Sequence, residues 1–151
     1  MNLVYIFTPI ILSFIINIFI FRTKNKSLIK SRKLKYLPPG GIIGIVWIIL
    51  LGLLGYIYSL IDNKNKSMNI QKILLILLTI FCLSYSVLTA NSTIRFSKNY
   101  NYLTLLFVLI VYYSIYTKYH EISYYLIPLL CWVLYVNIIT FLDDIQFINV
   151  F

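Results

Sequence analysis

The sequence has few charged residues, and this scarcity excludes an ordinary soluble domain. Only 11% of its 151 residues are Asp, Glu, Lys or Arg, whereas soluble chains carry roughly 25%. Hydrophobic residues make up 61% of the chain, and its mean hydropathy is +0.90. Too few polar groups remain to cover a surface that faces water, so much of the surface must contact lipid. The sequence therefore predicts an integral membrane protein.

Residue types that carry chemistry are scarce as well. The chain has one histidine, His120, two cysteines and four acidic residues, and the acidic residues lie at the ends of apolar runs. No spacing of His, Cys or carboxylate residues fits a metal site. No charged residue lies at mid-membrane depth, which argues against an ion pump or a proton-coupled transporter. We therefore predict no catalytic residue, no metal, no cofactor and no enzymatic activity.

The chain does have long uncharged runs, which are separated by charged clusters. Five runs have about the length that a helix needs to cross a bilayer, namely residues 3–21, 42–61, 73–94, 100–117 and 122–142. Continuous apolar runs favour helices over a β-barrel, because each helix satisfies its own backbone. We expect an all-α membrane protein whose residues 1–151 form a single bundle of five transmembrane helices. The fourth run is rich in interfacial residues, so a bundle with four spans stays an alternative.

The net charge of +9 is concentrated in a basic loop, residues 22–41, and does not suggest a nucleic-acid partner. The first and third loops hold nine basic residues, and the second and fourth hold Lys64, Lys66, Lys72 and Lys118. This asymmetry predicts an N-terminus outside and a C-terminus in the cytoplasm. The charges follow the first apolar run, unlike those of a signal peptide, so we expect that span to be retained. The loop either sets topology and contacts anionic lipid or also steers an anionic ligand.

Small and polar residues form stripes on the expected helices. Four glycines share one face of the second span, namely Gly41, Gly44, Gly52 and Gly55. Small residues let membrane helices approach closely, so this face predicts a helix-packing contact. Further stripes contain Ser84, Asn91 and Arg95 in the third span, and Pro128, Trp132 and Tyr135 in the fifth. They indicate either a packed interior or a ligand cavity.

Two of these stretches match a family signature. Pro38 and Pro39 are followed eight residues after the second proline by Trp47, with Leu50 and Gly55 beyond it. In the fifth span, a tryptophan follows a proline by four residues and an aromatic residue follows three later. In both stretches the chain resembles the TspO/MBR family, the translocator proteins also called tryptophan-rich sensory proteins. The length, the five spans, the long first loop and the orientation agree with this resemblance.

The chain departs from the family pattern at several positions. Gly41 stands where the family has the first tryptophan of the loop motif. In the third span, Ser84 and Tyr85 stand at the family's Asn-Trp pair and Ile80 at its glutamine, and Thr140 replaces an asparagine in the fifth. The ligand specificity of the family therefore does not carry over residue by residue.

The resemblance implies a binding protein whose cavity between the helices is closed by the first loop and takes porphyrin, haem or a sterol. The expected site residues are Pro38, Pro39, Gly41, Trp47, Ser84, Tyr85, Pro128, Trp132 and Tyr135. Their aromatic rings suit a flat π surface, and the basic loop suits its carboxylates. One alternative is a small membrane scaffold or interaction protein that has lost ligand recognition. An intramembrane enzyme that degrades porphyrin is a further alternative, which a chain with two tryptophans makes less favourable.

The resemblance and the glycine face are compatible with a homodimer within a lipid bilayer, and the alternative is that this face is used for packing inside the monomer. The sequence does not choose between a mitochondrial and another cell membrane.

Overall fold

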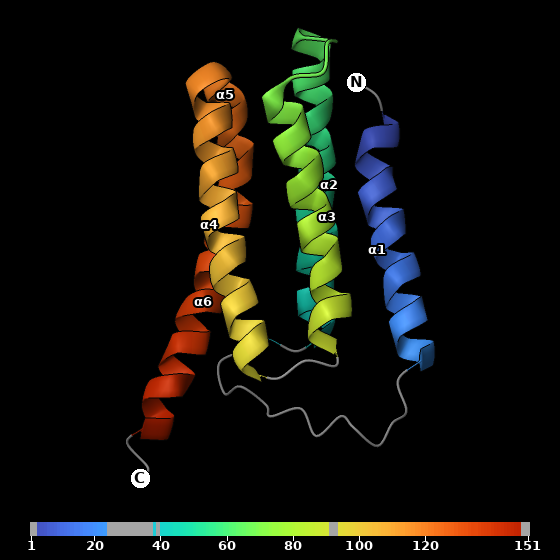
Figure 1. Ribbon diagram of the computed structural model, residues 1–151. Coiled ribbons are helices and arrows are strands. Elements are labelled where there is room, and N and C mark those ends of the chain that lie inside the picture. The colour runs from blue at the N-terminus through green and yellow to red at the C-terminus, as the bar shows by residue number, and fades with distance from the viewer. Residues whose placement is uncertain (1–2, 24–37, 39, 91–93, 149–151) are drawn as a thin grey trace.

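The protein is almost entirely helical in the part that its computed structural model describes, which comprises residues 3–23, 38, 40–90 and 94–148. The elements in chain order are α1 (Leu3–Thr23), α2 (Gly40–Lys64), α3 (Ile70–Ala90), α4 (Ile94–Lys118), α5 (His120–Ser123), the short 3₁₀ helix η2 (Tyr124–Leu126) and α6 (Ile127–Ile148) (Figure 1). The last three follow one another directly, so the chain forms five helical rods. This confirms the all-α membrane fold.

The rods differ from the expected spans mainly at their ends. Four of them are long and apolar enough to cross a membrane, over Gly41–Lys64, Ile70–Leu88, Arg95–Lys118 and His120–Leu142. The fourth run, whose interfacial residues left a four-span bundle as an alternative, is among these, whereas α1 contributes the shorter apolar segment Leu3–Phe19. The polar residues before position 100 continue the helix of α4, because a helix satisfies its backbone in the interface as well as in the hydrocarbon.

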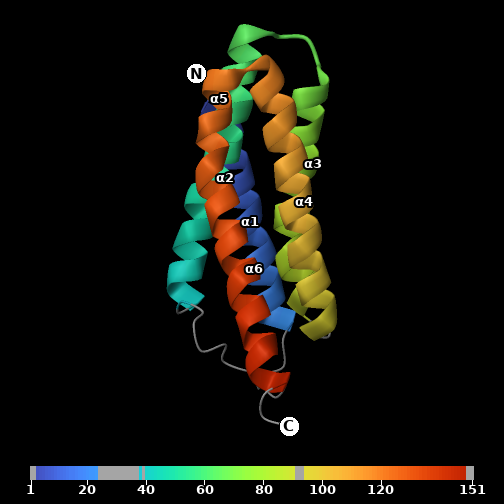
Figure 2. The same ribbon diagram turned by 90° about the vertical axis from the view of Figure 1, so that its left-hand side faces the viewer.

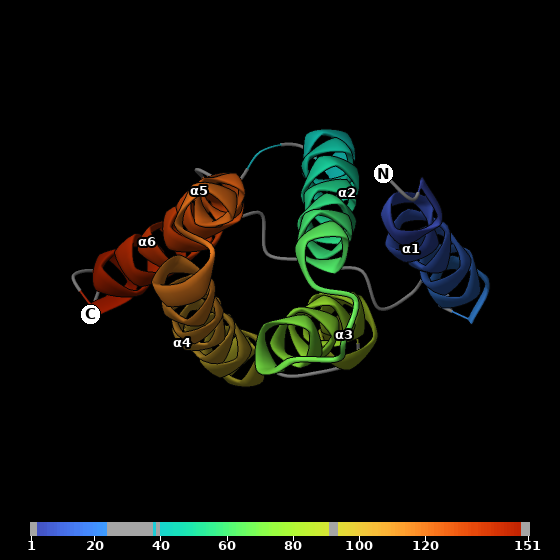
Figure 3. The same cartoon turned by 90° about the horizontal axis from the view of Figure 1, so that it is seen from above.

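The helices form an arc when they are seen from above (Figure 3). Helix α1 packs against α2 and α3, α3 packs against α4, and α4 packs against α6. The start of α1, the connection between α2 and α3, and α5 lie at one end of the bundle (Figures 1 and 2). We call this the α2–α3 end. The opposite end, where α2 begins and α3 ends, is called the α1–α2 end.

The buried core lies among α2, α3, α4 and the α5–η2–α6 rod. Its fully buried apolar residues include Leu54, Ile57, Leu78, Val108, Ile115 and Leu126. Many large apolar side chains point outward instead, such as Phe19 at 69% exposure and Tyr113 at 70%. An apolar exterior around a compact interior suits a bilayer, where lipid replaces water as the solvent of the outer face.

Helices α1 and α2 approach each other at Gly55. A Cβ added there would lie 2.7 Å from the Tyr5 carbonyl carbon and 2.8 Å from Ile6 Cα. Pro9 in α1 has no N–H to donate to the Tyr5 carbonyl four residues before it, and this carbonyl faces the glycine. The expected packing contact therefore forms here and at Gly52, which lies against Ile10.

The other half of the glycine stripe does not pack in this way. A Cβ at Gly41 or at Gly44 would have no atom within 4 Å, and both residues are exposed. The expectation of one continuous packing face is wrong for these two positions, because the α1 residues that meet Gly52 and Gly55 do not reach them.

A group of polar side chains joins the helices at the α2–α3 end. We call Asp62, Asn69, Gln71, Lys72 and Tyr119 the polar cluster. Lys72 Nζ lies 2.5 Å from Asp62 Oδ1, and only 1% of Lys72 is exposed. Gln71 Nε2 donates to the Ser114 carbonyl at 3.4 Å and Asn69 Nδ2 to Tyr119 Oη at 3.3 Å. The cluster thus connects α2, α3, α4 and the start of α5.

Asn69 also explains where α3 begins. Its side-chain oxygen accepts a hydrogen bond from the Lys72 backbone N–H at 3.0 Å, which is the pattern of a helix N-cap. Lys72, counted above with the second loop, therefore lies in the first turn of α3 and points to α2.

Candidate ligand-binding site

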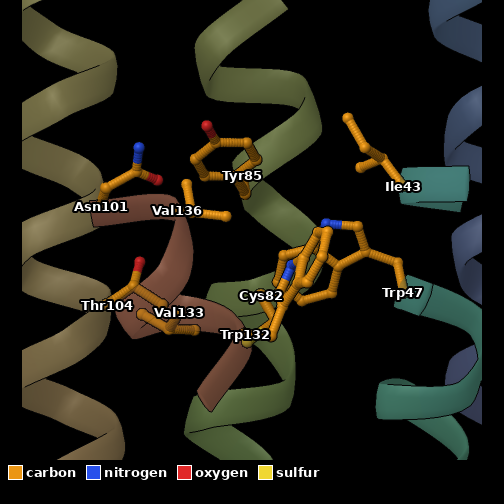
Figure 4. Close-up of a pocket in the computed structure, with 9 residues that line it drawn as sticks. All are labelled: Ile43, Trp47, Cys82, Tyr85, Asn101, Thr104, Trp132, Val133 and Val136. Carbon is orange, nitrogen blue, oxygen red and sulfur yellow. The ribbon is translucent and has the colours of Figure 1, made fainter. Parts of the chain in front are cut away.

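A cavity of about 180 Å³ lies between α2, α3, α4 and α6, in the half of the bundle nearer the α1–α2 end. The residues that line it are Ile43, Trp47, Cys82, Tyr85, Asn101, Thr104, Trp132, Val133 and Val136 (Figure 4). None of these side chains is a Lys, Arg, Asp or Glu. The lining is therefore apolar and aromatic, with two polar residues contributed by α4.

The volume limits what the cavity holds in this conformation. Pockets for drug-sized ligands begin at about 300 Å³, and an apolar cavity of about 150 Å³ takes one benzene ring. The cavity thus accommodates one ring or a fused pair, and any larger ligand would extend beyond it.

The wall formed by α2 and α3 is aromatic. The rings of Trp47 and Tyr85 stack with their centroids 6.5 Å apart and an interplanar angle of 27°. The Tyr85 ring also lies 5.6 Å from the Tyr100 ring of α4. Contacts to both neighbouring helices therefore hold the Tyr85 ring in place beside Trp47.

Ser84 takes part in a contact behind this wall and does not line the cavity. The hydroxyls of Ser84 and Tyr100 lie 2.7 Å apart, and each lies 2.9 Å from the Phe81 carbonyl oxygen. The rings of Phe81 and Tyr100 stack at 4.4 Å. Ser84 and Phe81 thus join α3 to α4, which fixes the rotation of α3 that directs Tyr85 to the cavity.

The wall formed by α6 is built around Trp132. Its ring lies 5.7 Å from that of Tyr135, and its indole nitrogen is buried without an acceptor among the described residues. Asn137 Nδ2 donates to the Val133 carbonyl at 2.8 Å and to the Asn101 carbonyl at 3.2 Å. The bond to Asn101 attaches α6 to α4 beside the cavity.

The remaining expected site residues lie outside the lining. Tyr135 is 40% exposed, and Pro128 is exposed as well. Pro38 is half-buried just before α2, and Gly41 is exposed in its first turn. Pro39 lies outside the described residues. Of the nine expected residues, the structure brings Trp47, Tyr85 and Trp132 together in the lining of one cavity.

Arg95 and Asn91 belonged to the stripe expected on the third span. Arg95 lies instead in the first turn of α4 as an exposed residue, and Asn91 falls outside the part of the chain that the structure describes.

Six lining residues were not predicted from the sequence, although the spacing of most of them indicates that they belong to the site. Ile43 precedes Trp47 by four residues, Cys82 precedes Tyr85 by three, and Val136 follows Trp132 by four, so each shares a helix face with an expected residue. Asn101 and Thr104 belong to α4, for which no motif was available. Their signal is the spacing of two polar residues, three apart, in an apolar helix.

The fold and the cavity together define a class of protein. An all-helical bundle with an apolar exterior and four helices long enough to cross a bilayer is an integral, multi-pass membrane protein. The model of the TspO/MBR family matches residues 5–142, which is nearly the whole chain, and the chain belongs to this family. No curated protein and no solved structure matches it.

Proposed function

We infer that the protein is a TspO-like membrane receptor or transporter that binds a flat hydrophobic ligand, a tetrapyrrole such as porphyrin or haem, or a sterol. One observation carries this proposal: Trp47, Tyr85 and Trp132, from three different helices, line one cavity in a chain of this family. Stacked aromatic rings favour a flat π system, and each such pair contributes about 0.5–1.5 kcal/mol beyond its buried area. Part of the ligand would occupy the cavity, and the rest would extend past it.

The first loop supports a tetrapyrrole in particular. Its two attachment points, Thr23 and Gly40, both lie at the α1–α2 end, which is also the end nearer the cavity. The basic residues of that loop would then pair with ligand carboxylates that stay outside the apolar lining. The proposed orientation, with this end toward the cytoplasm, follows from the same charges.

The proposed function is binding without catalysis. TspO/MBR proteins are in general receptors or transporters. Among the described residues no three His, Cys, Asp or Glu side chains are placed to hold a metal ion, so the binding chemistry would be that of rings and hydrogen bonds. A homodimer would have to use a face other than Gly52 and Gly55, because these pack against α1 within one chain.

A scaffold without a ligand is the second candidate, and two observations favour it. The cavity is smaller than the usual range for drug-sized ligands. Gly41 brings no ring to the entrance, and no atom lies within 4 Å of the place that its Cβ would occupy.

Porphyrin titration of the purified protein separates these candidates. Both tryptophans of the chain line the cavity, so intrinsic tryptophan fluorescence reports on this site alone. We expect saturable quenching at about micromolar affinity or tighter. Trp47→Phe and Trp132→Phe should each weaken binding about two- to tenfold. Tyr113→Phe, an exposed position on α4, is the matched control and should bind like the parent.

The proposal would be contradicted if the folded protein showed quenching that rises linearly with porphyrin concentration, without saturation. That behaviour is expected of porphyrin that partitions into the micelle and does not occupy a site. The same outcome with a fluorescent sterol would support the scaffold. Bleaching of the porphyrin spectrum with turnover under light would instead indicate an enzyme.

A further inference from the structure

The exposed tyrosines of the protein gather at one end of the bundle. Among the described residues six tyrosines are 40% exposed or more, and four of them lie at the α2–α3 end, where α4 finishes and the last rod begins (Figures 1 and 2). We call these four the tyrosine surface: Tyr113, Tyr116, Tyr124 and Tyr125. The other two are Tyr102 and Tyr135, and the exposed rings of the opposite end also include Phe19, Phe96 and Phe141, which carry no hydroxyl.

Stacking joins the tyrosine surface into one continuous face. Residues four apart on a helix lie above one another, and the ring centroids of Tyr112 and Tyr116 are 6.0 Å apart. The Tyr116 ring lies 4.5 Å from that of His120, which lies 5.1 Å from that of Tyr124. The Tyr124 hydroxyl is 3.3 Å from His120 Nε2. The face therefore runs from the last turns of α4 onto η2.

The turn formed by α5 and η2 has an apolar inner side and a tyrosine outer side. Ile122 and Leu126 are buried against the core. The Tyr125 ring meets that of Tyr56 on α2 edge to face at 5.3 Å, yet Tyr125 is 42% exposed and Tyr124 is 51% exposed. The turn is thus fixed to the bundle from within, and its outer rings are directed to the surroundings.

The level of these rings coincides with the end of the apolar spans. Lys64 and Lys118 close the apolar segments of α2 and α4, and a lysine at the end of a span extends its ammonium group to water. Along the helix axis, Tyr113 and Tyr116 precede Lys118 by about 8 Å and about 3 Å. Lys64 Nζ lies 3.7 Å from the highly exposed carboxylate of Glu121, which places the start of α5 at the same level. The tyrosine surface therefore lies at the boundary between hydrocarbon and water.

The hydroxyls of this surface are available to a partner outside the protein. Those of Tyr113, Tyr116 and Tyr125 have no hydrogen-bond partner among the residues that the structure describes, unlike the hydroxyls of the buried Tyr100 and Tyr119. A phenol ring is apolar along its body and donates a hydrogen bond at its tip. The lipid groups that suit such a ring at this level are phosphate and ester oxygens, which accept hydrogen bonds above an apolar layer.

We propose that the tyrosine surface binds the interfacial layer of the bilayer, with its rings beside the upper part of the lipid chains and its hydroxyls donating to phospholipid phosphate or ester oxygens. This contact holds the α2–α3 end at a fixed depth through rings. At the opposite end the basic residues of the first loop would contact the headgroups by charge. The tyrosine surface shares no residue with the cavity, so the inference goes beyond the proposed function and is independent of it.

Depth-dependent quenching of a single tryptophan tests this placement. The full chain carrying Trp47→Phe and Trp132→Phe has no tryptophan, and one reporter is added to it as Tyr113→Trp or as Tyr124→Trp. Leu106→Trp is the matched control, because Leu106 is 57% exposed at the middle of α4. Each chain is reconstituted in phosphatidylcholine vesicles that are brominated either near the glycerol end of the lipid chains or near their methyl end, and a melting curve shows that it is folded.

We expect the reporters at positions 113 and 124 to be quenched at least about twofold more by the shallow bromines than by the deep ones, as interfacial rings are. The Leu106→Trp control should show the reverse order. Equal or stronger quenching by the deep bromines would place the rings in the hydrocarbon and overturn the inference. Quenching by aqueous iodide without quenching by either lipid would place them in water and overturn it as well. The two reporters lie on different elements, so each is a test even where the other variant does not fold.

Discussion

The two ends of the bundle use their polar groups in opposite ways. At the α2–α3 end, the polar cluster pairs a buried lysine with a carboxylate and joins α3 to α2, α4 and the start of α5. Around the cavity, aromatic rings replace ion pairs, and the indole N–H of Trp132 has no acceptor among the described residues. Paired polar groups fix helices to one another, whereas a cavity lined by rings leaves room for a ligand. Stability and binding are thus expected to depend on different ends.

Breaking the ion pair of the polar cluster should have the largest effect. Asp62→Asn leaves the Lys72 ammonium buried without its counterion, which we expect to cost about 3–5 kcal/mol of folding free energy. Lys72→Met should cost less, because Asp62 is 26% exposed and can be hydrated. Thermal unfolding of both variants in one detergent compares them. Equal losses, or a larger loss for Lys72→Met, would refute this account of the cluster.

Disrupting the contact between α1 and α2 should have the second-largest effect on stability. In Gly55→Ala the new methyl group meets the Tyr5 backbone, which cannot move as a side chain can, so we expect a loss of about 1–3 kcal/mol. Gly44→Ala on the same helix is the matched control, since nothing lies near its Cβ. It should be neutral or stabilise by up to about 1 kcal/mol through helix propensity. Melting curves of the two variants that coincide would show that α1 does not pack as described.

The hydrogen bonds behind the aromatic wall should have a smaller effect. Tyr100→Phe keeps the ring stacked on Phe81 and removes the hydroxyl that lies near Ser84 and the Phe81 carbonyl. We expect a loss of about 1 kcal/mol in stability and a modest weakening of porphyrin binding, because the hydroxyl joins α4 to the turn of α3 that carries Tyr85. Paired melting and binding curves measure both quantities. Unchanged binding together with unchanged stability would remove Tyr100 from the description of the site.

The fold was largely predictable because long uncharged runs admit few structures in a bilayer. The burial of Lys72 was not, since a lysine next to a polar segment looks like a loop residue. Only the position of Asp62 across from it and the cap at Asn69 place it inside α3.

The candidate site was predictable where a motif indicated both the residue and the helix face, as for Trp47 and Trp132. The lining residues were less predictable where the rotation of a helix about its axis decides which side chains face the cavity. On α6, Val133 and Val136 line the cavity, so its face is rotated from the stripe that contains Trp132 and Tyr135, and Tyr135 turns outward. Such a rotation depends on the bond from Asn137 to α4, which no periodicity reveals.

The most direct test of the central claim compares the two ends in one binding experiment. Porphyrin is titrated into Trp47→Ala/Trp132→Ala and into Lys72→Met, and binding is followed by the porphyrin's own absorption band, because the double variant lacks tryptophan. The account predicts that the double variant, although folded, binds at least about a hundredfold more weakly than the parent. Lys72→Met should melt earlier yet bind with the parent's affinity. A folded double variant that binds porphyrin as tightly as the parent would contradict the account.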